Sequence, residues 1–143
     1  MRESYVHHTR VLSLALGVML TAASCGHSAK EDVSPEYQAS LAARQCYEAL
    51  YLHNRPESFL YGRAQMGSMP DDFRQQLLEA YRSHVRQVEY AHQGVTAVDV
   101  VRAQVDTTLQ CVQVFLALDY GDGEREEMVV PMVAGSEGQW RMK

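Results

Sequence analysis

The hydrophobic period of this sequence changes near residue 95, and this change limits the fold more than any other feature. Before it, apolar residues recur every three or four positions, which is typical of amphipathic helices. After it, Val101, Ala103 and Val105 alternate with polar residues, a pattern that indicates half-buried strands. Helices followed by strands predict an α+β fold, in which the helices cover one face of the sheet.

Two helices are expected in the first part of the chain. The first begins at Ser34, whose side chain can cap it, with Pro35 in its first turn. Its apolar residues keep a helical spacing until about His53. A short second helix is expected over residues 55–61, followed by a loop over residues 62–69.

A long third helix is expected to begin near Pro70 and to end at Gly94. Ser68 and Asp71 have the spacing of a capping box, with Asp in place of the usual Glu. The residues that share its expected inward face are Phe73, Leu77, Tyr81, Val85 and Val88.

Four consecutive strands are expected after Gly94, over residues 95–106, 109–120, 126–133 and 139–143. Residues 121–123, Gly-Asp-Gly, are typical of a hairpin turn that needs positive φ. Short turns between all four strands predict an antiparallel meander. The second strand is apolar on both faces, so we expect it in the centre of the sheet, with its second face partly covered or dimeric.

Several stretches of this region resemble a known family. Residues 68–74, 120–123, 129–133 and 138–142 look like small Gram-negative lipoproteins of unknown function with the nuclear transport factor 2-like, or cystatin-like, fold. The similarity covers about residues 38–143. It implies N-terminal helices packed on a curved four-stranded antiparallel sheet that forms a cone. The superfamily includes isomerases and dehydratases that work inside this cone, but a fold alone does not imply an enzyme.

The first 24 residues have the order of a secretory signal peptide. A start that contains Arg2 and Arg10 precedes an apolar run over residues 11–20, and small residues follow. A transmembrane helix needs about 20 apolar residues, and this run ends after roughly 13. We therefore expect cleavage and export of the chain rather than a membrane-spanning helix.

The three small residues 22–24, immediately before Cys25, resemble a lipobox. This resemblance implies a lipoprotein whose Cys25 carries palmitate-type acyl chains and attaches the chain to the cell envelope, on the periplasmic or the surface side. Leu is usual where Ala22 stands, and the alternative is ordinary signal-peptidase cleavage to a soluble secreted protein. The expected organisation is a signal peptide over 1–24, a lipid-anchored tether over 25–33 and the folded domain over 34–143.

The charge of the chain argues against nucleic-acid binding. It has 13 basic and 18 acidic residues, a formal net charge of −5, and no basic cluster. Neutralisation of phosphates supplies most of the affinity for nucleic acid, and anionic membrane surfaces also attract basic segments. The expected partners are the membrane through the lipid anchor, an unknown protein or apolar ligand, and a second copy of the chain.

We expect neither a metal ion nor a cofactor. His84 and His92 lie on one predicted helix about 12 Å apart, too far to share an ion. The acidic hairpin near residues 119–127 does not fit an EF-hand, because Leu118 and Tyr120 stand where oxygen ligands are needed. The sequence also has no glycine-rich phosphate loop, nucleophile elbow or metalloprotease pair.

An apolar pocket edged by hydroxyl groups is the candidate site, with an ordinary core as the alternative. The candidate lining residues are Tyr47, Tyr51, Tyr81, Met128, Met132 and Trp140. We therefore expect a non-catalytic ligand- or protein-binding module. The alternative is a small pocket enzyme of the isomerase or dehydratase type, with Asp99 as its base because Asp99 shares the strand parity of Val101 and Ala103.

Cys46 and Cys111 are an even pair in a chain that is expected to reach an oxidising compartment. One alternative is a disulfide between the first helix and the second strand. The other is a pair of buried free thiols that behave as small hydrophobic side chains. A Cα separation beyond about 7 Å would rule out the bond.

Overall fold

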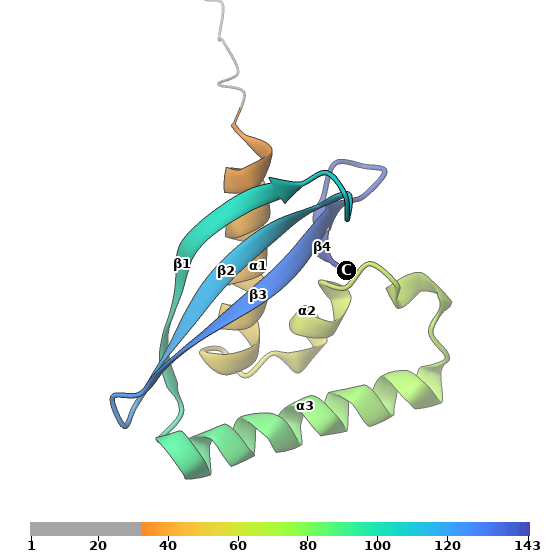
Figure 1. Cartoon of the computed structure of the whole chain (residues 1–143). Helices are drawn as coiled ribbons and strands as arrows, with labels where there is room; N and C mark the ends of the chain where they lie inside the picture. Colours follow the sequence, from red (N-terminus) through yellow and green to blue (C-terminus); the bar gives the residue numbers. More distant parts are fainter. Residues whose placement is uncertain (1–32) are drawn as a thin grey trace, which may run out of the picture. The chain divides into compact units, whose positions relative to one another are not determined.

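The computed structural model describes residues 33–143. Its helices are α1 (Pro35–Tyr51), α2 (Pro56–Tyr61), the 3₁₀ helix η1 (Met66–Ser68) and α3 (Asp71–His92), and its strands are β1 (Val95–Asp106), β2 (Cys111–Tyr120), β3 (Arg125–Ala134) and β4 (Trp140–Met142). The predicted order of helices and then strands is confirmed (Figure 1). The predicted signal peptide and Cys25 lie outside the described residues. No described helix has both the length and the hydrophobicity to cross a membrane.

Helix α1 begins as its sequence predicts. The Ser34 side chain accepts a hydrogen bond from the Tyr37 N–H at 3.2 Å, and Pro35 occupies the first turn. The proline needs no hydrogen-bond partner there, because the first N–H groups of a helix have none within the helix. Helix α1 ends at Tyr51, two residues before the predicted end.

The start of α3 differs from the prediction. The Ser68 hydroxyl donates to the Gln65 carbonyl at 3.4 Å, and no side chain caps α3 at Pro70. Ser68 already belongs to η1, so it is not available to cap α3, and the predicted capping box is wrong. Asp71 instead pairs with Arg74, one turn into the helix, at 3.0 Å.

The buried face of α3 also differs from the predicted stripe. Val85 and Val88 are buried as expected, but Phe73 is 47% exposed. Leu78, which was not predicted to face inward, packs with Leu60 and Met66 in a second small core. The first half of α3 therefore packs on the α2–η1 segment rather than on the sheet, and this turns a different set of side chains inward.

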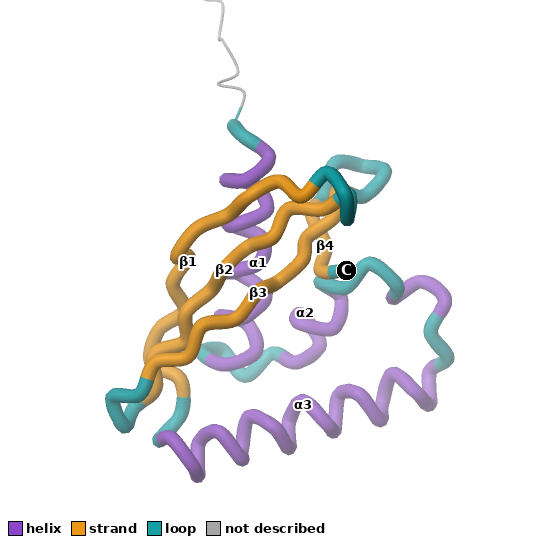
Figure 2. The backbone as a smooth tube through the Cα atoms, in the orientation of Figure 1, coloured by secondary structure: helices purple, strands orange, loops and turns teal. Residues whose placement is uncertain are grey.

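The sheet is an antiparallel meander in the order β1-β2-β3-β4, as predicted. Helix α1 lies against one face of it (Figures 1 and 2). The central strand β2 turns Val114, Leu116 and Leu118 toward this helix-covered face, and all three are fully buried. This face of the sheet and α1 enclose the main hydrophobic core.

The two edges of the sheet differ. Residues 62–64 close the β4 edge, because the Met142 N–H donates to the Gly62 carbonyl at 2.7 Å and the Ala64 N–H donates to the Met142 carbonyl at 2.8 Å. Arg63 and Met142 form a parallel bridge there. On the outer side of β1, no described segment pairs with the backbone. The short strand β4 pairs only with residues 132–134 of β3, so residues 125–130 of β3 also have no described strand on their outer side, whereas the β1 edge is open along its whole length.

Candidate functional site

The six predicted pocket residues all lie in or against the main core. The Tyr47 ring packs edge-on against Phe59 at a centroid distance of 5.2 Å, and Phe59 packs edge-on against Tyr81 at 5.0 Å. Three helices supply these rings, which together fill space between the helices and the sheet. Met132 is fully buried. The role of the six residues as a pocket stays a prediction, and of the six only Trp140 also lines one of the hollows described below.

Tyr51 is suited to donate a hydrogen bond rather than to exchange a proton. Its hydroxyl lies 2.9 Å from Nε2 of His84. Burial raises the pKa of Tyr51 to about 12, so the hydroxyl keeps its proton near neutral pH. A catalytic base or acid works best when its pKa is near the working pH, and this pKa is far above it.

Asp99, the base in the enzyme hypothesis, does not face inward. Its side chain is 52% exposed, and its carboxylate lies 3.6 Å from Nη1 of Arg125. The register of β1 against β2 shifts between Val100 and Arg102, so the strand parity used in the prediction changes at this bulge. The inward placement of Asp99 was wrong for this reason.

Two apolar hollows follow one another along α1 and β1. The first has a volume of about 370 Å³, and its lining residues are Glu36, Tyr37, Ser40, Leu41, Arg44, Val100 and Ala103. The second has a volume of about 470 Å³, and its lining residues include Pro35, Val105, Cys111, Val112, Val133 and Trp140. We call the two hollows together the edge groove. The first lies between α1 and the open edge of β1, and the second begins at Val105 of β1 and continues across the end of β2 to β3 and β4.

The edge groove exposes large apolar side chains. Tyr37 is 62% exposed, Leu41 is 46% exposed and Val105 is 50% exposed. Trp140 helps to fix the second hollow, because its Nε1–H donates to Oε1 of Gln38 on α1 at 3.1 Å. A concave apolar surface of this kind marks an interaction site more often than scattered apolar residues do.

Comparison with known proteins defines the fold. No family model and no curated protein matches the sequence. A crystal structure of a Campylobacter jejuni protein, provisionally assigned as an NTF2-like (nuclear transport factor 2-like) transpeptidase, matches with a TM-score of 0.55 and 9% identity. The match covers 70% of this chain and 92% of that chain. The chain has an NTF2-like fold. At 9% identity the likeness concerns the fold alone.

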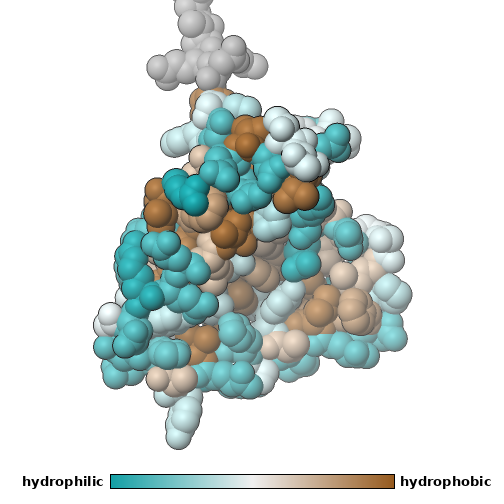
Figure 3. Space-filling model, viewed as in Figure 1, coloured by the Kyte–Doolittle hydropathy of each residue, from teal (hydrophilic) through white to brown (hydrophobic). Residues whose placement is uncertain are grey.

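None of the helices within residues 33–143 lies over the second face of the NTF2-like sheet (Figure 1). Apolar and hydrophilic side chains mix on this side of the molecule (Figure 3). The guanidinium carbon of Arg102 lies 3.4 Å from the centre of the Phe115 ring and covers it. Val129, across the ladder from Phe115, is 49% exposed. A charged side chain thus covers the largest apolar residue of this face.

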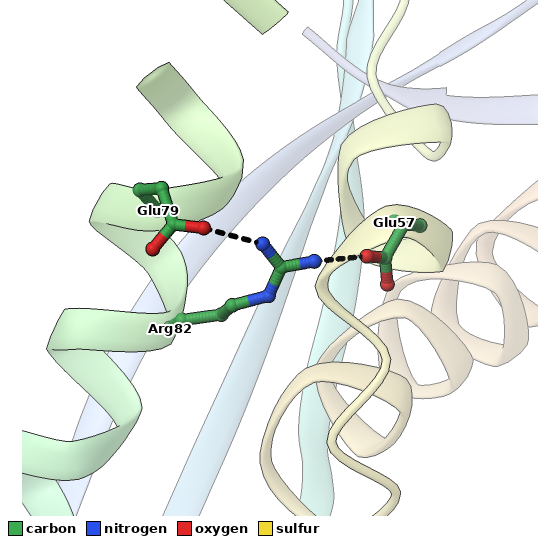
Figure 4. Close-up of polar contacts among 3 residues, drawn as sticks. All are labelled: Glu57, Glu79 and Arg82. Atoms are coloured by element: carbon green, nitrogen blue, oxygen red, sulfur yellow. Dashed lines mark hydrogen bonds and ion pairs between the residues drawn. The ribbon is translucent and has the colours of Figure 1, made fainter. Parts of the chain in front are cut away.

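Polar contacts tie the helices of the NTF2-like fold together. Nη1 of Arg82 on α3 lies 2.7 Å from Oε1 of Glu79, and Nη2 of the same guanidinium pairs with Glu57 on α2 (Figure 4). These charges are partly exposed, and they join α3 to α2. The ion pairs therefore help to fix the position of α2 against α3. Among the described residues, no group of three or more His, Cys, Asp or Glu side chains is placed to hold a metal ion.

Cys46 and Cys111 are free thiols in the structure, which corresponds to the alternative of two unbonded cysteines. Pro35 is the α1 residue that lines a hollow together with Cys111. Cys46 lies eleven residues further along α1, about 16 Å from Pro35 at the helical rise. Burial raises the pKa of the Cys46 thiol, which makes it a poor nucleophile.

Sequence reasoning did not find the edge groove. Tyr37 and Leu41 are separated by one helical turn, so they share a face of α1, but the sequence does not say whether the sheet covers that face. The available signal was in β1, where Val100 and Val101 are adjacent apolar residues that interrupt the alternation. The structure shows that both are exposed at the open edge.

Proposed function

We propose that this chain is a lipid-anchored, non-catalytic binding module of the bacterial cell envelope, and that its edge groove binds an apolar partner. The observation that carries this proposal is the contrast between the core and the edge. Aromatic side chains fill space inside the cone, whereas the edge groove is concave, apolar and open.

The anchor is proposed from the leader and from Cys25, as the sequence predicts. Pro35, which lines the second hollow, follows Cys25 by ten residues. Ten extended residues span at most about 35 Å, so a lipid on Cys25 would keep the edge groove within that distance of the membrane surface. A module held in this way would meet its partner close to the envelope.

A binding role is preferred over catalysis for reasons of chemistry. Asp99 is exposed and close to Arg125, Tyr51 holds its proton, and the Cys46 thiol is buried with a raised pKa. The raised pKa values of Tyr51 and Cys46 do not suit these two groups to proton transfer or to nucleophilic attack near neutral pH. The activity in the description of the C. jejuni protein is therefore not carried over to this chain.

Mass spectrometry of the mature N-terminus tests the anchor. The full-length chain is expressed in a Gram-negative host and purified with the membrane fraction. We expect Cys25 to be the first residue and to carry acyl chains, and Cys25→Ala to release the protein from the membrane. An unmodified Cys25, or a mature N-terminus at another residue, would refute the anchor.

Binding of a hydrophobic fluorescent dye, 1-anilinonaphthalene-8-sulfonate, tests the edge groove. We expect Leu41→Glu to weaken dye binding at least about tenfold, because each 1.4 kcal/mol of lost apolar contact is tenfold in affinity. Leu52→Glu is the matched control, since Leu52 is 37% exposed and lies at the other end of α1. Equal effects of the two substitutions would place the dye elsewhere and count against the groove.

A further inference from the structure

We propose that the edge groove binds an extended polypeptide segment of another protein, and that this segment pairs with β1 as a fifth strand. The inference rests on the proposed function, because it names the partner of the same groove. It follows from three observations, namely the open backbone of β1, the placement of the two hollows and the charges at their ends.

The backbone of β1 offers a template. The strand has twelve residues and pairs with β2 on one side only. No described segment satisfies the N–H and C=O groups of its other side. Such groups can pair with an added strand, and these main-chain hydrogen bonds supply affinity for extended peptides.

The two hollows match the side-chain spacing of a strand. Ala103 lines the first hollow and Val105 lines the second, and the two residues are two positions apart on one face of β1. Residues two apart in an added strand lie about 7 Å apart on one face. A segment beside β1 can therefore place one side chain in each hollow and turn the residue between them to solvent. Tyr37 and Leu41 of α1 then contact its inward side chains.

The charges of the groove indicate which charged residues the two ends of a bound segment should carry. Glu36 lines the first hollow directly after Pro35, which lines the second, and Glu36 forms no ion pair with any described residue. Asp106 lies next to Val105, but its carboxylate already accepts hydrogen bonds from the Leu109 N–H and from Gln113. Arg44 lines the first hollow together with Val100, and its Nε donates to Oε1 of Glu48 at 2.7 Å, which leaves the other N–H groups of its guanidinium for a ligand. A segment with a basic residue near Glu36, an acidic residue near Arg44 and aliphatic residues at alternate positions between them complements this pattern.

A second copy of the chain fits this edge less well. The bulge between Val100 and Arg102 lies in the middle of β1. Symmetric antiparallel pairing of two full β1 strands would set the two bulges opposite each other and interrupt both ladders at the same place. A short segment can pair with residues 102–106 alone, where the strand is regular and both hollows are within reach.

Two labelled peptides test the inference by fluorescence anisotropy with the full-length chain, purified as the host processes it. Both alternate Val with Thr over seven residues, and one has Lys at its N-terminus and Glu at its C-terminus, while the other has the reverse. The peptide with N-terminal Lys matches Glu36 and Arg44 when it lies antiparallel to β1, and the reverse peptide matches them only when it lies parallel. We expect the peptide with N-terminal Lys to bind about tenfold more tightly, because antiparallel pairing is the more stable. Equal binding of the two peptides would show that the charges do not select the segment.

N-methylation of the peptide that binds more tightly distinguishes backbone pairing with β1 from contact between apolar side chains alone. Successive residues of a strand turn their N–H groups to opposite edges, so methylation of every odd residue blocks one edge and methylation of every even residue blocks the other. We expect one pattern to abolish binding and the other to preserve it. Val105→Lys should weaken binding at least about tenfold, and the control Gln104→Lys, on the opposite face of β1, less than about twofold.

The outcomes distinguish this inference from the proposed function. If the dye binds but neither peptide binds at about 1 mM, or if both methylation patterns bind alike, strand addition is refuted and the apolar groove stands. If neither dye nor peptide binds, both proposals fail. A concentration-dependent dimer that Val105→Lys dissociates would assign the edge to a second copy and refute the inference.

Discussion

Nδ1 of His92, at the end of α3, lies 2.9 Å from Oδ2 of Asp122, in the turn between β2 and β3. The Asp122 N–H also donates to the His92 carbonyl at 3.1 Å, and the His92 ring stacks on Tyr120 at a centroid distance of 4.7 Å. These contacts join two segments that are thirty residues apart. They fix the end of the long helix to the hairpin of the sheet.

This contact predicts an acid-dependent effect of Asp122→Asn on stability. The backbone N–H of Glu124 and the His92 side chain hold the pKa of Asp122 below its ordinary value. A lowered folded-state pKa stabilises the fold above the unfolded value, near pH 4, and this stability is lost as the pH falls through the lowered pKa. We expect the variant to melt at a lower temperature at pH 7 and the difference to vanish in acid.

Thermal unfolding between pH 2 and pH 8 measures this difference. Asp72→Asn, at an exposed position in the first turn of α3, is the control for loss of a surface charge. A difference that stays constant across the pH range would show that Asp122 acts without its ionisation.

The raised pKa of Tyr51 predicts that its contribution to stability is lost in base rather than in acid. Its folded-state pKa is raised to about 12, so its contribution is complete below the unfolded value near pH 10 and is lost as the pH rises through about 12. Tyr51→Phe should cost about 1 kcal/mol at neutral pH, because the hydrogen bond to His84 is lost, and less in base. Tyr47 and Tyr120 also ionise late, because burial raises the pKa of each. Phenolate absorbance should therefore lose one of several late ionisations in this variant and none in Tyr90→Phe, whose side chain is 94% exposed.

Phe59 is the central ring of the aromatic contacts, so its removal should leave a cavity. We expect Phe59→Ala to lower the free energy of unfolding by about 3–5 kcal/mol. Phe73→Ala should cost about 0.5 kcal/mol, since that ring is 47% exposed. Denaturant unfolding of both variants compares the same chemical change at a buried and at an exposed site. Similar losses would contradict the packing described for α3.

A side chain at position 62 is expected to clash with Cys46, and a smaller residue at position 46 is expected to relieve the clash. A Cβ on Gly62 would lie 2.5 Å from Sγ of Cys46, so Gly62→Ala should cost about 1–3 kcal/mol. Cys46→Ala should restore most of this loss in the double variant. At Gly121 the Cβ would lie 2.5 Å from the backbone oxygen of Gln93, which no side-chain deletion removes. A double-mutant cycle that finds Gly62 and Cys46 independent would contradict this contact.

The order and extent of the elements followed from local patterns in the sequence. Ser34 and Pro35 marked the start of α1, and the change in hydrophobic period near residue 95 marked the start of β1, as the structure confirms. The inward face of α3 did not follow from its pattern. Both Phe73 and Leu78 are apolar, and only the tertiary position of α2 and η1 decides which of them is buried.

The edge groove could not be predicted for a similar reason. It depends on where α1 crosses the sheet and on which strand forms the open edge. Both are features of the tertiary structure that a local sequence pattern does not encode. The bulge between Val100 and Arg102 then reverses the face of every later residue of β1 relative to a regular strand. The sequence pattern could gather the tyrosines and methionines into one apolar group, but it does not say whether these side chains surround a space or occupy it.

The pairing of residues 62–64 with β4 removes one place where a strand of another chain could be added to the sheet. Two stretches stay without a described strand on their outer side, the whole of β1 and residues 125–130 of β3. Growth of an open-ended filament requires two complementary edges on every subunit. An assembly in which each copy uses β1 alone therefore stops at one partner for each copy.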